Sequence, residues 1–517
     1  MRWGLMPSVC LAGTPLKSLS TNAKVTVRPG PGCDPTKTQL DYILDLPMTH
    51  KVAIHRSCVC NEEVALFNRH LLDRRTEKYD PAYIRSCFTA VKRDIMECMD
   101  PVTPISFLQV INRYRGAKRA SYIRAWEEIK TIGFQKRWAN VTMFVKPDKY
   151  AEADIHEKAP RAIQYRRPAF NLSLARFLHP YEKELYQIKP KFNGEKLCIA
   201  KGRNNQQRAE DLIDLISDFE DPCFLLIDHS KFDSSCTVDH FKEIHKMYLE
   251  ALPSKELRSM LKMQLFNKGR TQGGIIYRVN GTKMSGDYNT ALDNTLLNLI
   301  VLYSWLKDRV KARYYLDGDD SVVIIEKKDE HLLDMEHFER FGFVTVMQRV
   351  YEPSSIEFCR SKLLDISRPV FARNPYRALS NMCCSVKHYE GKARLKYLAG
   401  NALGEMHRSS GVPVLFPAAK AIYDKYGSHG IILDTQQRYK MDLFKVDEFP
   451  PITLEAREAF QVAFGISIAT QLELEQEIPK RIVALKIDSI QTFATFFSLP
   501  DSALTLKDQY ASEETEA

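Results

Sequence analysis

YYLDGDDSVVII, from Tyr314 to Ile325, is the stretch of this 517-residue chain that decides its fold. Two apolar runs, Tyr314 to Leu316 and Val322 to Ile325, flank a Gly-Asp turn, which is the pattern of a β-hairpin. Such a hairpin presents the turn carboxylates of Asp319 and Asp320 at one end of a sheet. Taken alone the pattern is common, because an Asp beside a strand is usually a turn or cap residue.

A further carboxylate precedes this hairpin in the chain. Phe224 to Ile227 is a short apolar run that ends at Asp228, as expected of a buried strand with a polar side chain at its end. A helix with one apolar stripe is expected from Val238, a strand within Gly273 to Gly281, and a long helix from about Tyr288. If the Asp228 strand neighbours the hairpin, the carboxylates converge.

Converging carboxylates are the ligands that hard divalent cations such as Mg²⁺ prefer. Two such ions about 4 Å apart can stabilise the attacking oxygen and the departing pyrophosphate when a nucleotide is added to a chain. We therefore expect Asp228 and Asp319 to bind a metal pair, with Asp320 joining or supporting them.

The ordered combination of three segments is more specific than any one of them. Asp228 to Asp233 precedes Ser285 to Asn294, which precedes Gly318-Asp319-Asp320. These segments resemble motifs A, B and C of positive-strand RNA virus polymerases, in that order. The segment from Met284 to Asn294 especially resembles the tombusvirus-like group, and the likeness extends over about residues 110 to 420.

Other segments also resemble this group. Tyr114 to Lys118 is similar to the segment where the template enters, Phe144 to Lys149 and Lys158 to Gln164 are similar to motif F, and Ile356 to Arg360 is similar to motif E. Arg373 to Pro375 and Gly411 to Leu415 resemble thumb segments.

The resemblance implies an α+β fold, a right-hand polymerase with fingers, a palm of antiparallel sheet backed by helices, and a thumb. We expect an N-terminal extension over 1-50, fingers with motif F over 51-220, a palm with motifs A to E over 221-365 and a fingers insertion near 255-284. Thumb and C-terminal tail would occupy 366-517, where Leu472 to Leu485 would be either a thumb helix broken near Pro479 or a contact with a partner. Residues 14 to 50 are rich in Pro and Gly, so regular structure there should be interrupted and an extension or linker is expected.

The resemblance also implies roles for individual residues. Asp228, Asp319 and Asp320 would be the catalytic metal ligands. The site for the incoming nucleotide would be formed by Asp233, Ser285, Thr290 and Asn294 at the ribose and by Lys158 and Arg161 at the triphosphate. Template or RNA contacts are expected from Gly286, Lys146, Lys149, Arg166, Arg167, Tyr114 and Gly116. For the four basic residues of that set, a solvated surface position is an equal alternative.

The implied function is an RNA-dependent RNA polymerase that replicates a positive-strand viral RNA genome by template-directed transfer of nucleotides from NTPs. Two Mg²⁺ ions would be the cofactors, with Mn²⁺ as an alternative ion. RNA template, nascent RNA, NTPs and viral or host replication proteins would be partners, and the net charge of +9 suits a polyanion. No apolar run approaches the ~20 residues that cross a bilayer. A place in a membrane-associated complex of the host cytoplasm would therefore depend on a partner or an upstream region.

Two other classes of function remain as alternatives. A reverse transcriptase shares this chemistry but normally has a bulky aromatic residue where Asp233 stands here, and a non-catalytic RNA-binding protein would have lost a metal ligand. The proton donor to pyrophosphate stays unassigned. Related polymerases often carry a lysine after Phe343, whereas this chain has Val344 to Arg349, and a guanidinium is a poor acid. Lys327, Lys328 or water are the alternatives.

Cysteine and histidine give no clear metal pattern. Of twelve cysteines, Cys58 and Cys60 form one close pair and Cys383-Cys384 another, but neither has a partner pair at a zinc-type interval. We expect reduced thiols, with a structural zinc site as the minor alternative. His229 and His240 are expected at the surface or in a helix cap.

Overall fold

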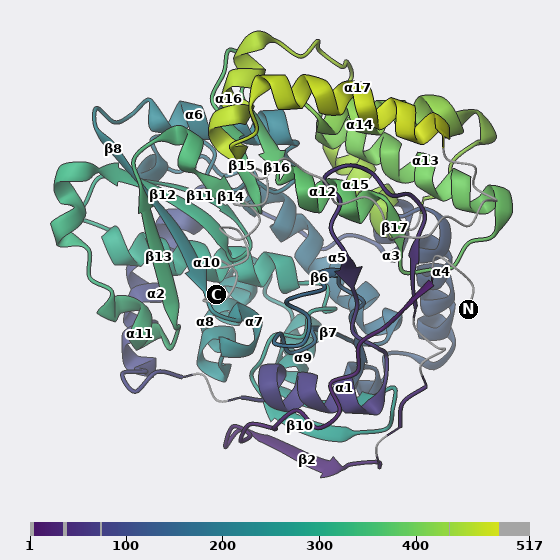
Figure 1. Cartoon of the computed structure of the whole chain (residues 1–517). Helices are drawn as coiled ribbons and strands as arrows, with labels where there is room; N and C mark the ends of the chain where they lie inside the picture. The colour runs from purple at the N-terminus through teal and green to yellow at the C-terminus, as the bar shows by residue number, and fades with distance from the viewer. Residues whose placement is uncertain (1–4, 31, 35–38, 73–74, 434, 485–517) are drawn as a thin grey trace.

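The structure is a computed structural model of the chain, and it describes residues 5–30, 32–34, 39–72, 75–433 and 435–484. Helices and strands alternate along the chain, so the expected α+β class is confirmed. In Figure 1 a four-stranded sheet lies at the left, the C-terminal helices lie at the top, and a five-stranded sheet lies toward the bottom.

The strands are short and widely spaced in the chain. They are β1 (Leu5–Pro7), β2 (Ala23–Val27), β3 (Gln39–Tyr42), β4 (Val52–Ala53), β5 (Val141–Val145), β6 (Tyr150–Ala151), β7 (Ala162–Tyr165), β8 (Pro222–His229), β9 (Phe266–Thr271), β10 (Ile276–Asn280), β11 (Ala312–Asp317), β12 (Asp320–Glu326), β13 (Thr345–Val350), β14 (Glu357–Phe358), β15 (Ser361–Leu364), β16 (Val370–Arg373) and β17 (Cys384–Ser385).

The α-helices lie between the strands and dominate the C-terminal part. They are α1 (Val59–Ala65), α2 (Pro81–Met96), α3 (Phe107–Asn112), α4 (Gly116–Ile132), α5 (Pro168–Leu185), α6 (Asn205–Ile216), α7 (Phe232–Ser235), α8 (Val238–Ala251), α9 (Lys255–Leu265), α10 (Thr290–Leu306), α11 (Glu336–Phe341), α12 (Pro375–Met382), α13 (Gly391–Arg408), α14 (Leu415–Tyr426), α15 (Thr435–Phe444), α16 (Leu454–Phe464) and α17 (Ile468–Ala484).

The four-stranded sheet has the order β11-β12-β8-β13 and is antiparallel throughout. The expected hairpin is confirmed as β11 and β12, and the strand of Asp228 is its neighbour β8. Side chains alternate across β8: Leu225 and Ile227 share a core with α10, whereas Phe224 packs on the other face with residues of α6. Apolar residues on both faces of β8 therefore bury the strand between two helical layers.

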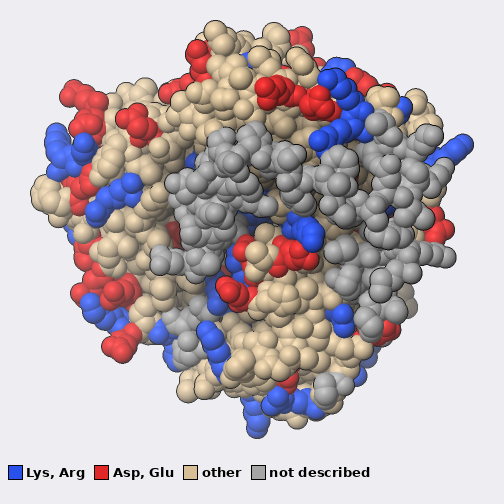
Figure 2. All heavy atoms as spheres, viewed as in Figure 1, with Lys and Arg blue, Asp and Glu red and all other residues tan. Residues whose placement is uncertain are grey.

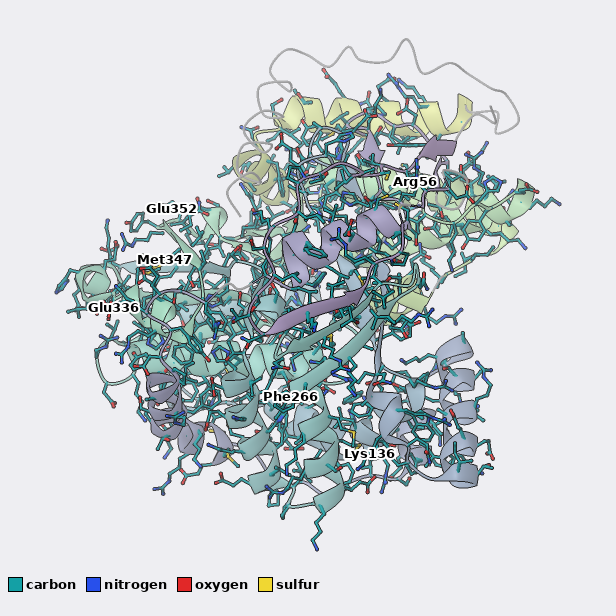
Figure 3. The ribbon with its side chains drawn as sticks, turned by 90° about the horizontal axis from the view of Figure 1, so that it is seen from below. Arg56, Lys136, Phe266, Glu336, Met347 and Glu352 are labelled. Carbon is teal, nitrogen blue, oxygen red and sulfur yellow. The ribbon has the colours of Figure 1, made fainter. Side chains whose placement is uncertain are left out.

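The five-stranded sheet has the order β2-β10-β9-β5-β7, with only β5 and β9 parallel. The strand expected within Gly273 to Gly281 is confirmed as β10, while its hairpin partner β9 was missed. Figure 3 labels Phe266 on β9 and Met347 on β13, and these residues show that the two large sheets lie apart.

The N-terminal segment differs from the linker expected over residues 14 to 50. β2 pairs with β10, and β3 pairs with both β1 and β17. Leu44, Leu46 and Met48 are buried in the core formed by the C-terminal helices. Pairing partners more than two hundred residues away hold this Pro- and Gly-rich segment in regular structure, although its local sequence is unfavourable.

The C-terminal helices pack around one core. α17 continues through Pro479, so the expected break is wrong. Ile478 and Ile482 of α17 are buried among residues of α14 and α16, and this burial stabilises the helix despite the proline. Within the residues that the structure describes, no helix is both long and apolar enough to span a bilayer.

Charged residues of both signs are interspersed on the face of the molecule seen in Figure 2. The net charge of +9 is therefore not gathered into one continuous basic patch on this face.

Candidate active site

The strands bring the predicted carboxylates to one end of the four-stranded sheet. Ile227 of β8 pairs with Ser321 of β12 in antiparallel register. Asp228 follows Ile227 and Asp320 precedes Ser321, so the two aspartates lie at the same end of the paired strands. Both residues keep solvent-accessible surface that a ligand can reach, although the surrounding protein partly desolvates their carboxylates. Asp319 lies in the adjoining turn and acts electrostatically on both.

The proximity of these carboxylates alters their titration. Desolvation and then the charge of Asp319 raise the pKa of Asp228. Desolvation, followed by the charges of Asp319 and Asp317, raises the pKa of Asp320 to about 7. Oxygen ligands with excess negative charge fit hard divalent cations. The three aspartates are spread more widely than a single compact ion site, because among described residues only four cysteines have ligand atoms all within 4.8 Å.

Helix α10 holds the turn that carries Asp319. The Gly318 amide donates a hydrogen bond to Thr295 Oγ1 at 3.1 Å. Asn298 Nδ2 donates to the carbonyl oxygens of Gly318 and Asp319, both at 3.1 Å. Sequence reasoning missed both side chains, although Thr295 and Asn298 follow Ala291 at intervals of four and seven residues, which marks one helix face.

His229 supports the same turn from behind. Its ring nitrogens contact Thr345 Oγ1 at 2.8 Å and Asn298 Oδ1 at 3.3 Å, and the ring is buried. Desolvation lowers the pKa of His229 to about 4, so the ring is neutral at pH 7. His240 is also buried and caps α8 through Thr237. The surface position expected for these two residues is wrong, whereas the capping role of His240 is confirmed.

Asp317 has a different role from the two aspartates that follow it. Lys201 and Arg208 form ion pairs with its carboxylate. Although burial opposes ionisation, these two cations lower the pKa of Asp317. One carboxylate of the Asp-Gly-Asp-Asp sequence is thus neutralised by the protein, which leaves the other two for an added cation.

Two residues of the predicted ribose site, Asn294 and Asp233, are hydrogen-bonded to each other. Asn294 Nδ2 donates to Asp233 Oδ1 at 2.7 Å. Asn294 Oδ1 is buried and accepts no hydrogen bond from the described residues. Desolvation raises the pKa of Asp233, and Asp319 acts in the same direction. This amide oxygen therefore has an unused capacity to accept a hydroxyl hydrogen.

The other residues predicted for this region organise the loop before α10. Ser285 Oγ donates to Ala162 O at 3.1 Å and accepts from Gln164 N at 3.1 Å. Thr290 Oγ1 donates to Met284 O at 2.7 Å. A Cβ on Gly286 would lie 2.6 Å from Tyr165 Cβ, so this glycine permits close contact with β7, where sequence reasoning had expected a contact with template.

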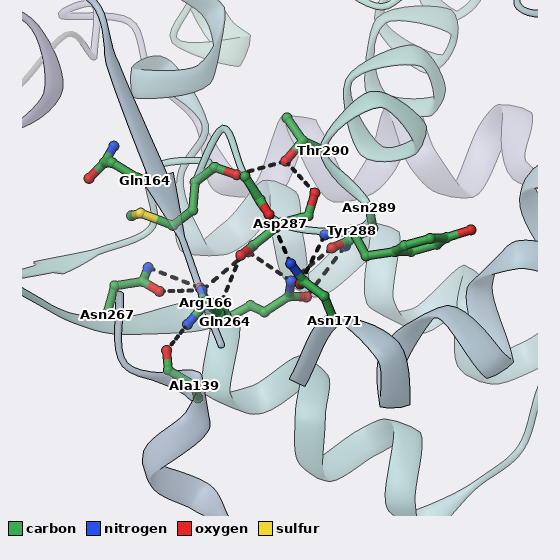
Figure 4. Close-up of polar contacts among 12 residues, drawn as sticks. Ala139, Gln164, Arg166, Asn171, Gln264, Asn267, Asp287, Tyr288, Asn289 and Thr290 are labelled. Carbon is green, nitrogen blue, oxygen red and sulfur yellow. Dashed lines mark hydrogen bonds and ion pairs between the residues drawn. The ribbon is translucent and has the colours of Figure 1, made fainter. Parts of the chain in front are cut away.

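A buried polar network lies under this loop (Figure 4). Arg166 Nε donates to Asp287 Oδ1 at 2.8 Å, and both side chains are at most 2% exposed. Gln264 also donates to Asp287, at 2.9 Å, and Asn267 accepts from Arg166 at 2.6 Å. The expectation that Arg166 contacts template is corrected, because its guanidinium is enclosed and already paired.

Lys158 and Arg161, predicted at the triphosphate, and Lys146, predicted to contact RNA, lie beside acidic partners. Lys146 and Arg161 both contact Asp148, at 3.0 and 3.6 Å, and Lys158 lies 3.7 Å from Asp154. Arg161 is close enough to Asp233 to lower its pKa, which opposes the larger effect of burial. Sequence reasoning missed Arg69, which lies near Arg161 and Asp233 and whose pKa is lowered by burial and by Arg161.

The remaining predicted RNA contacts are more scattered. Lys149 donates to Asn381 O at 2.8 Å and Cys384 O at 2.6 Å, so it ties two distant segments together. Arg167 is exposed and contacts Glu128 at 3.1 Å. Tyr114 packs edge-on against Tyr122, and Gly116 is exposed at the start of α4 with a φ of 55°.

None of the candidates for the proton donor lies beside the carboxylates. Glu326 pairs with Pro222, so Lys327 follows β12 at the far end of β8, roughly 20 Å from Asp228 at the usual rise per residue. Arg349 pairs with Leu225 and contacts Glu330. Arg360, by contrast, acts on both Asp228 and Asp320 and opposes the rise in their pKa.

Comparison with known proteins independently supports the resemblance to viral RNA polymerases. A family model described as viral RNA-dependent RNA polymerase matches residues 25–485. The RNA-directed RNA polymerase of Pothos latent virus is 31% identical over 377 residues, covering 71% of this chain and 50% of the relative. The polymerases of melon necrotic spot virus and tomato bushy stunt virus are 29% and 27% identical, covering 86% and 84% of this chain and 59% and 55% of those relatives. The matched part of the chain thus spans between half and three fifths of the length of these relatives.

The buried ion pair between Arg166 and Asp287 predicts that the adjacent residues Arg166 and Arg167 contribute very differently to stability. We expect Arg166→Met to destabilise the protein by about 3–5 kcal/mol, because it leaves Asp287 charged and buried without its partner. The matched change Arg167→Met should cost about 0–1 kcal/mol, since its pair with Glu128 is exposed. Thermal unfolding of both variants measures the difference, and equal unfolding temperatures would contradict the assignment.

The carboxylate cluster predicts that cation binding depends on pH. Below about pH 7 Asp320 holds a proton that an incoming cation must displace, so affinity for Mn²⁺ should rise with pH by up to about tenfold per unit and level off above pH 7. Electron paramagnetic resonance of free Mn²⁺ measures this affinity. Asp320→Asn should weaken binding and flatten the profile, whereas Asp447→Asn, at an exposed position, should leave it unchanged. A flat profile for the unaltered protein would refute the prediction.

Proposed function

Because this chain belongs to the family of viral RNA-dependent RNA polymerases, we propose that it extends RNA on an RNA template and thereby replicates a positive-strand viral genome. The observation that carries the proposal is the convergence of Asp228, Asp319 and Asp320 beside the Asp233–Asn294 pair. Metal-binding and ribose-binding groups in one place are what nucleotide addition requires.

The donor set fits two divalent cations. Asp228, Asp319 and Asp320 offer several carboxylate oxygens, and desolvation together with the charge of Asp319 raises the pKa of Asp228 and of Asp320. Mg²⁺, or Mn²⁺ in its place, would be held by these residues and would stabilise the charge that develops on the attacking and leaving oxygens.

The chain's own residues would position the nucleotide. The unpartnered Oδ1 of Asn294 is suited to accept the 2′-hydroxyl hydrogen of a ribose, while Asn294 Nδ2 stays fixed by Asp233. Arg161 and Arg69 lie near Asp233 and would bind the triphosphate of the same nucleotide, and Lys158 is a further candidate. A phosphate would compete with Asp148 for Arg161, and guanidinium groups suit this exchange because they bind phosphate through two nitrogens.

The arrangement supports a right-hand architecture. The four-stranded sheet with its covering helices would be the palm, the five-stranded sheet with α4 and α5 would belong to the fingers, and α13, α14, α16 and α17 would form the thumb. Boundaries near residues 220 and 365 agree with where β8 begins and β15 ends. Lys149 would then join fingers to thumb through the carbonyl groups of Asn381 and Cys384.

The setting of this activity is also part of the proposal. Replication would take place in a membrane-associated complex of the host cytoplasm, with RNA, NTPs and viral or host proteins as partners. The similarity to relatives named RNA-directed RNA polymerase supports the RNA and NTP partners, and the other partners would be identified by purification of the replicating complex.

The central test is loss of one metal ligand. Asp319→Asn should lower the rate of NTP incorporation on an RNA template by at least about a hundredfold, because several kcal/mol of charge stabilisation depend on the cation. Asp447→Asn, at an exposed site far from α10 in the chain, serves as the control and should retain the rate. Retained synthesis by Asp319→Asn would refute its role. RNA binding without metal-dependent synthesis by the unaltered protein would instead favour a non-catalytic RNA-binding function.

The ribose contact predicts sugar selection. Asn294→Ala should reduce the preference for NTPs over dNTPs by about five- to thirtyfold, because it removes one hydrogen-bonding group worth about 1–2 kcal/mol. Single-nucleotide incorporation with matched GTP and dGTP measures the ratio, and Asn381→Ala is the control because that side chain lies at the end of α12. An unaltered protein that prefers dNTPs would favour a reverse transcriptase.

A further inference from the structure

Four cysteines from three parts of the N-terminal segment meet at one point. Cys10 lies just after β1, Cys33 lies between β2 and β3, and Cys58 and Cys60 lie at the start of α1. Their sulfur atoms all lie within 4.8 Å of one another. Cys10 Sγ is 2.9 Å from Cys33 Sγ and 3.7 Å from Cys58 Sγ, and Cys33 Sγ is 3.9 Å from Cys60 Sγ.

Two of these separations, 3.7 and 3.9 Å, match the edge of a tetrahedral site for a single ion, whereas the 2.9 Å between Cys10 Sγ and Cys33 Sγ is shorter and would lengthen when an ion binds. With Zn–S bonds of about 2.3 Å, the sulfur atoms of a Cys₄ site lie about 3.8 Å apart along each edge of the tetrahedron. A disulfide requires about 2.05 Å, and all four thiols are free. An iron–sulfur cluster would hold the four sulfurs farther apart, because several iron and sulfide atoms would lie between them.

The backbone around the four thiols is fixed by contacts that need no metal. Asn61 Nδ2 donates to Val9 O at 2.8 Å and to Arg56 O at 2.9 Å, and Asn61 Oδ1 accepts from Leu11 N at 2.8 Å. One fully buried amide thus holds the segments on both sides of Cys10 and Cys58. Sequence spacing could not reveal the cluster of four cysteines, because Cys10 and Cys33 lie far in the chain from the close pair Cys58 and Cys60.

A basic residue offsets part of the charge that four thiolates would bring. Arg56, labelled in Figure 3 next to α1, contacts the Cys33 thiol and bonds to Ser8 through its guanidinium. Although desolvation opposes it, contacts with the neighbouring thiols and with Arg56 lower the pKa of Cys33. Thiolate is the form that binds metal, and the positive charge of Arg56 would offset part of the charge of a thiolate at Cys33.

We propose that Cys10, Cys33, Cys58 and Cys60 bind one structural Zn²⁺ ion. The site is closed, since all four ligands come from the protein, and it therefore has no place for a substrate. It would join the N-terminal segment to α1 and, through α1, to the five-stranded sheet. Glu62 of α1 accepts the Gly273 amide at 3.0 Å in the turn between β9 and β10, and α1 continues into residues buried with β5, β7 and β10.

The first test measures metal content. The purified chain should contain one zinc ion per molecule by plasma mass spectrometry after dialysis. Cys33→Ser, at an exposed position that should not disturb folding, should lose the ion, whereas Cys33→His should keep it because histidine also binds zinc. Cys98→Ser is the matched control, since Cys98 lies outside the cluster and bonds to Asp94 O.

The second test measures geometry and stability without any activity assay. Replacement of the ion by Co²⁺ should give the visible absorption bands of a tetrahedral thiolate site in the unaltered protein and not in Cys33→Ser. Removal of zinc by a chelator should lower the temperature of thermal unfolding in the unaltered protein and in Cys98→Ser, with no shift in Cys33→Ser.

Three results would overturn the proposal. They are a zinc-free protein with four titratable thiols that takes up no Co²⁺, a disulfide between Cys10 and Cys33 in protein purified without oxidant, and zinc retained in full by both Cys33→Ser and Cys58→Ser. Misfolding of Cys58→Ser alone would not rescue it, because the metal content of the unaltered protein and of Cys33→Ser decides the outcome.

Discussion

Repulsion between carboxylates is the constraint on which the rest of this structure depends. Asp228, Asp319 and Asp320 meet at the end of β8 and the β11–β12 turn, and their mutual repulsion adds to the cost of desolvation. Uncharged side chains hold the turn that carries two of these aspartates. Thr295 and Asn298 of α10 bind the peptide groups of the turn, and the neutral ring of His229 supports Asn298 from β8. Because Arg360 opposes only part of the rise in pKa of Asp228 and Asp320, the cluster keeps its capacity for added cations.

Helix α10 connects this cluster to the five-stranded sheet. Its own side chains hold the aspartate turn and present Asn294, while the loop before it is clasped against β7 through Ser285 and Gly286. The buried pair Arg166–Asp287 fixes that loop from below. Under the proposed function, a ribose bound at Asn294 would depend on residues that both sheets hold in place. A small displacement of either sheet would therefore alter the fit of the nucleotide.

The N-terminal segment contributes to the same framework. β2 extends the five-stranded sheet, β3 contacts the C-terminal part through β17, and α1 binds the β9–β10 turn through Glu62. A zinc ion at the four cysteines would make this attachment more durable than such short strands could by themselves. It would act on the nucleotide site only indirectly, by holding the sheet that carries Arg161 and the loop partners of α10.

The sequence by itself determined the hairpin, the strand before Asp228, the apolar stripe of α8 and the order of the polymerase-like segments, because strand and helix periods and turn residues depend on near neighbours. It could not tell that Arg166 is buried and Arg167 exposed, that Asp317 is neutralised while Asp320 is not, or that Cys10 and Cys33 join Cys58 and Cys60. Nor could it show that α17 passes through Pro479. Those outcomes were decided by the tertiary structure alone, because burial and charge compensation depend on segments that lie far apart in the chain and meet only when it folds.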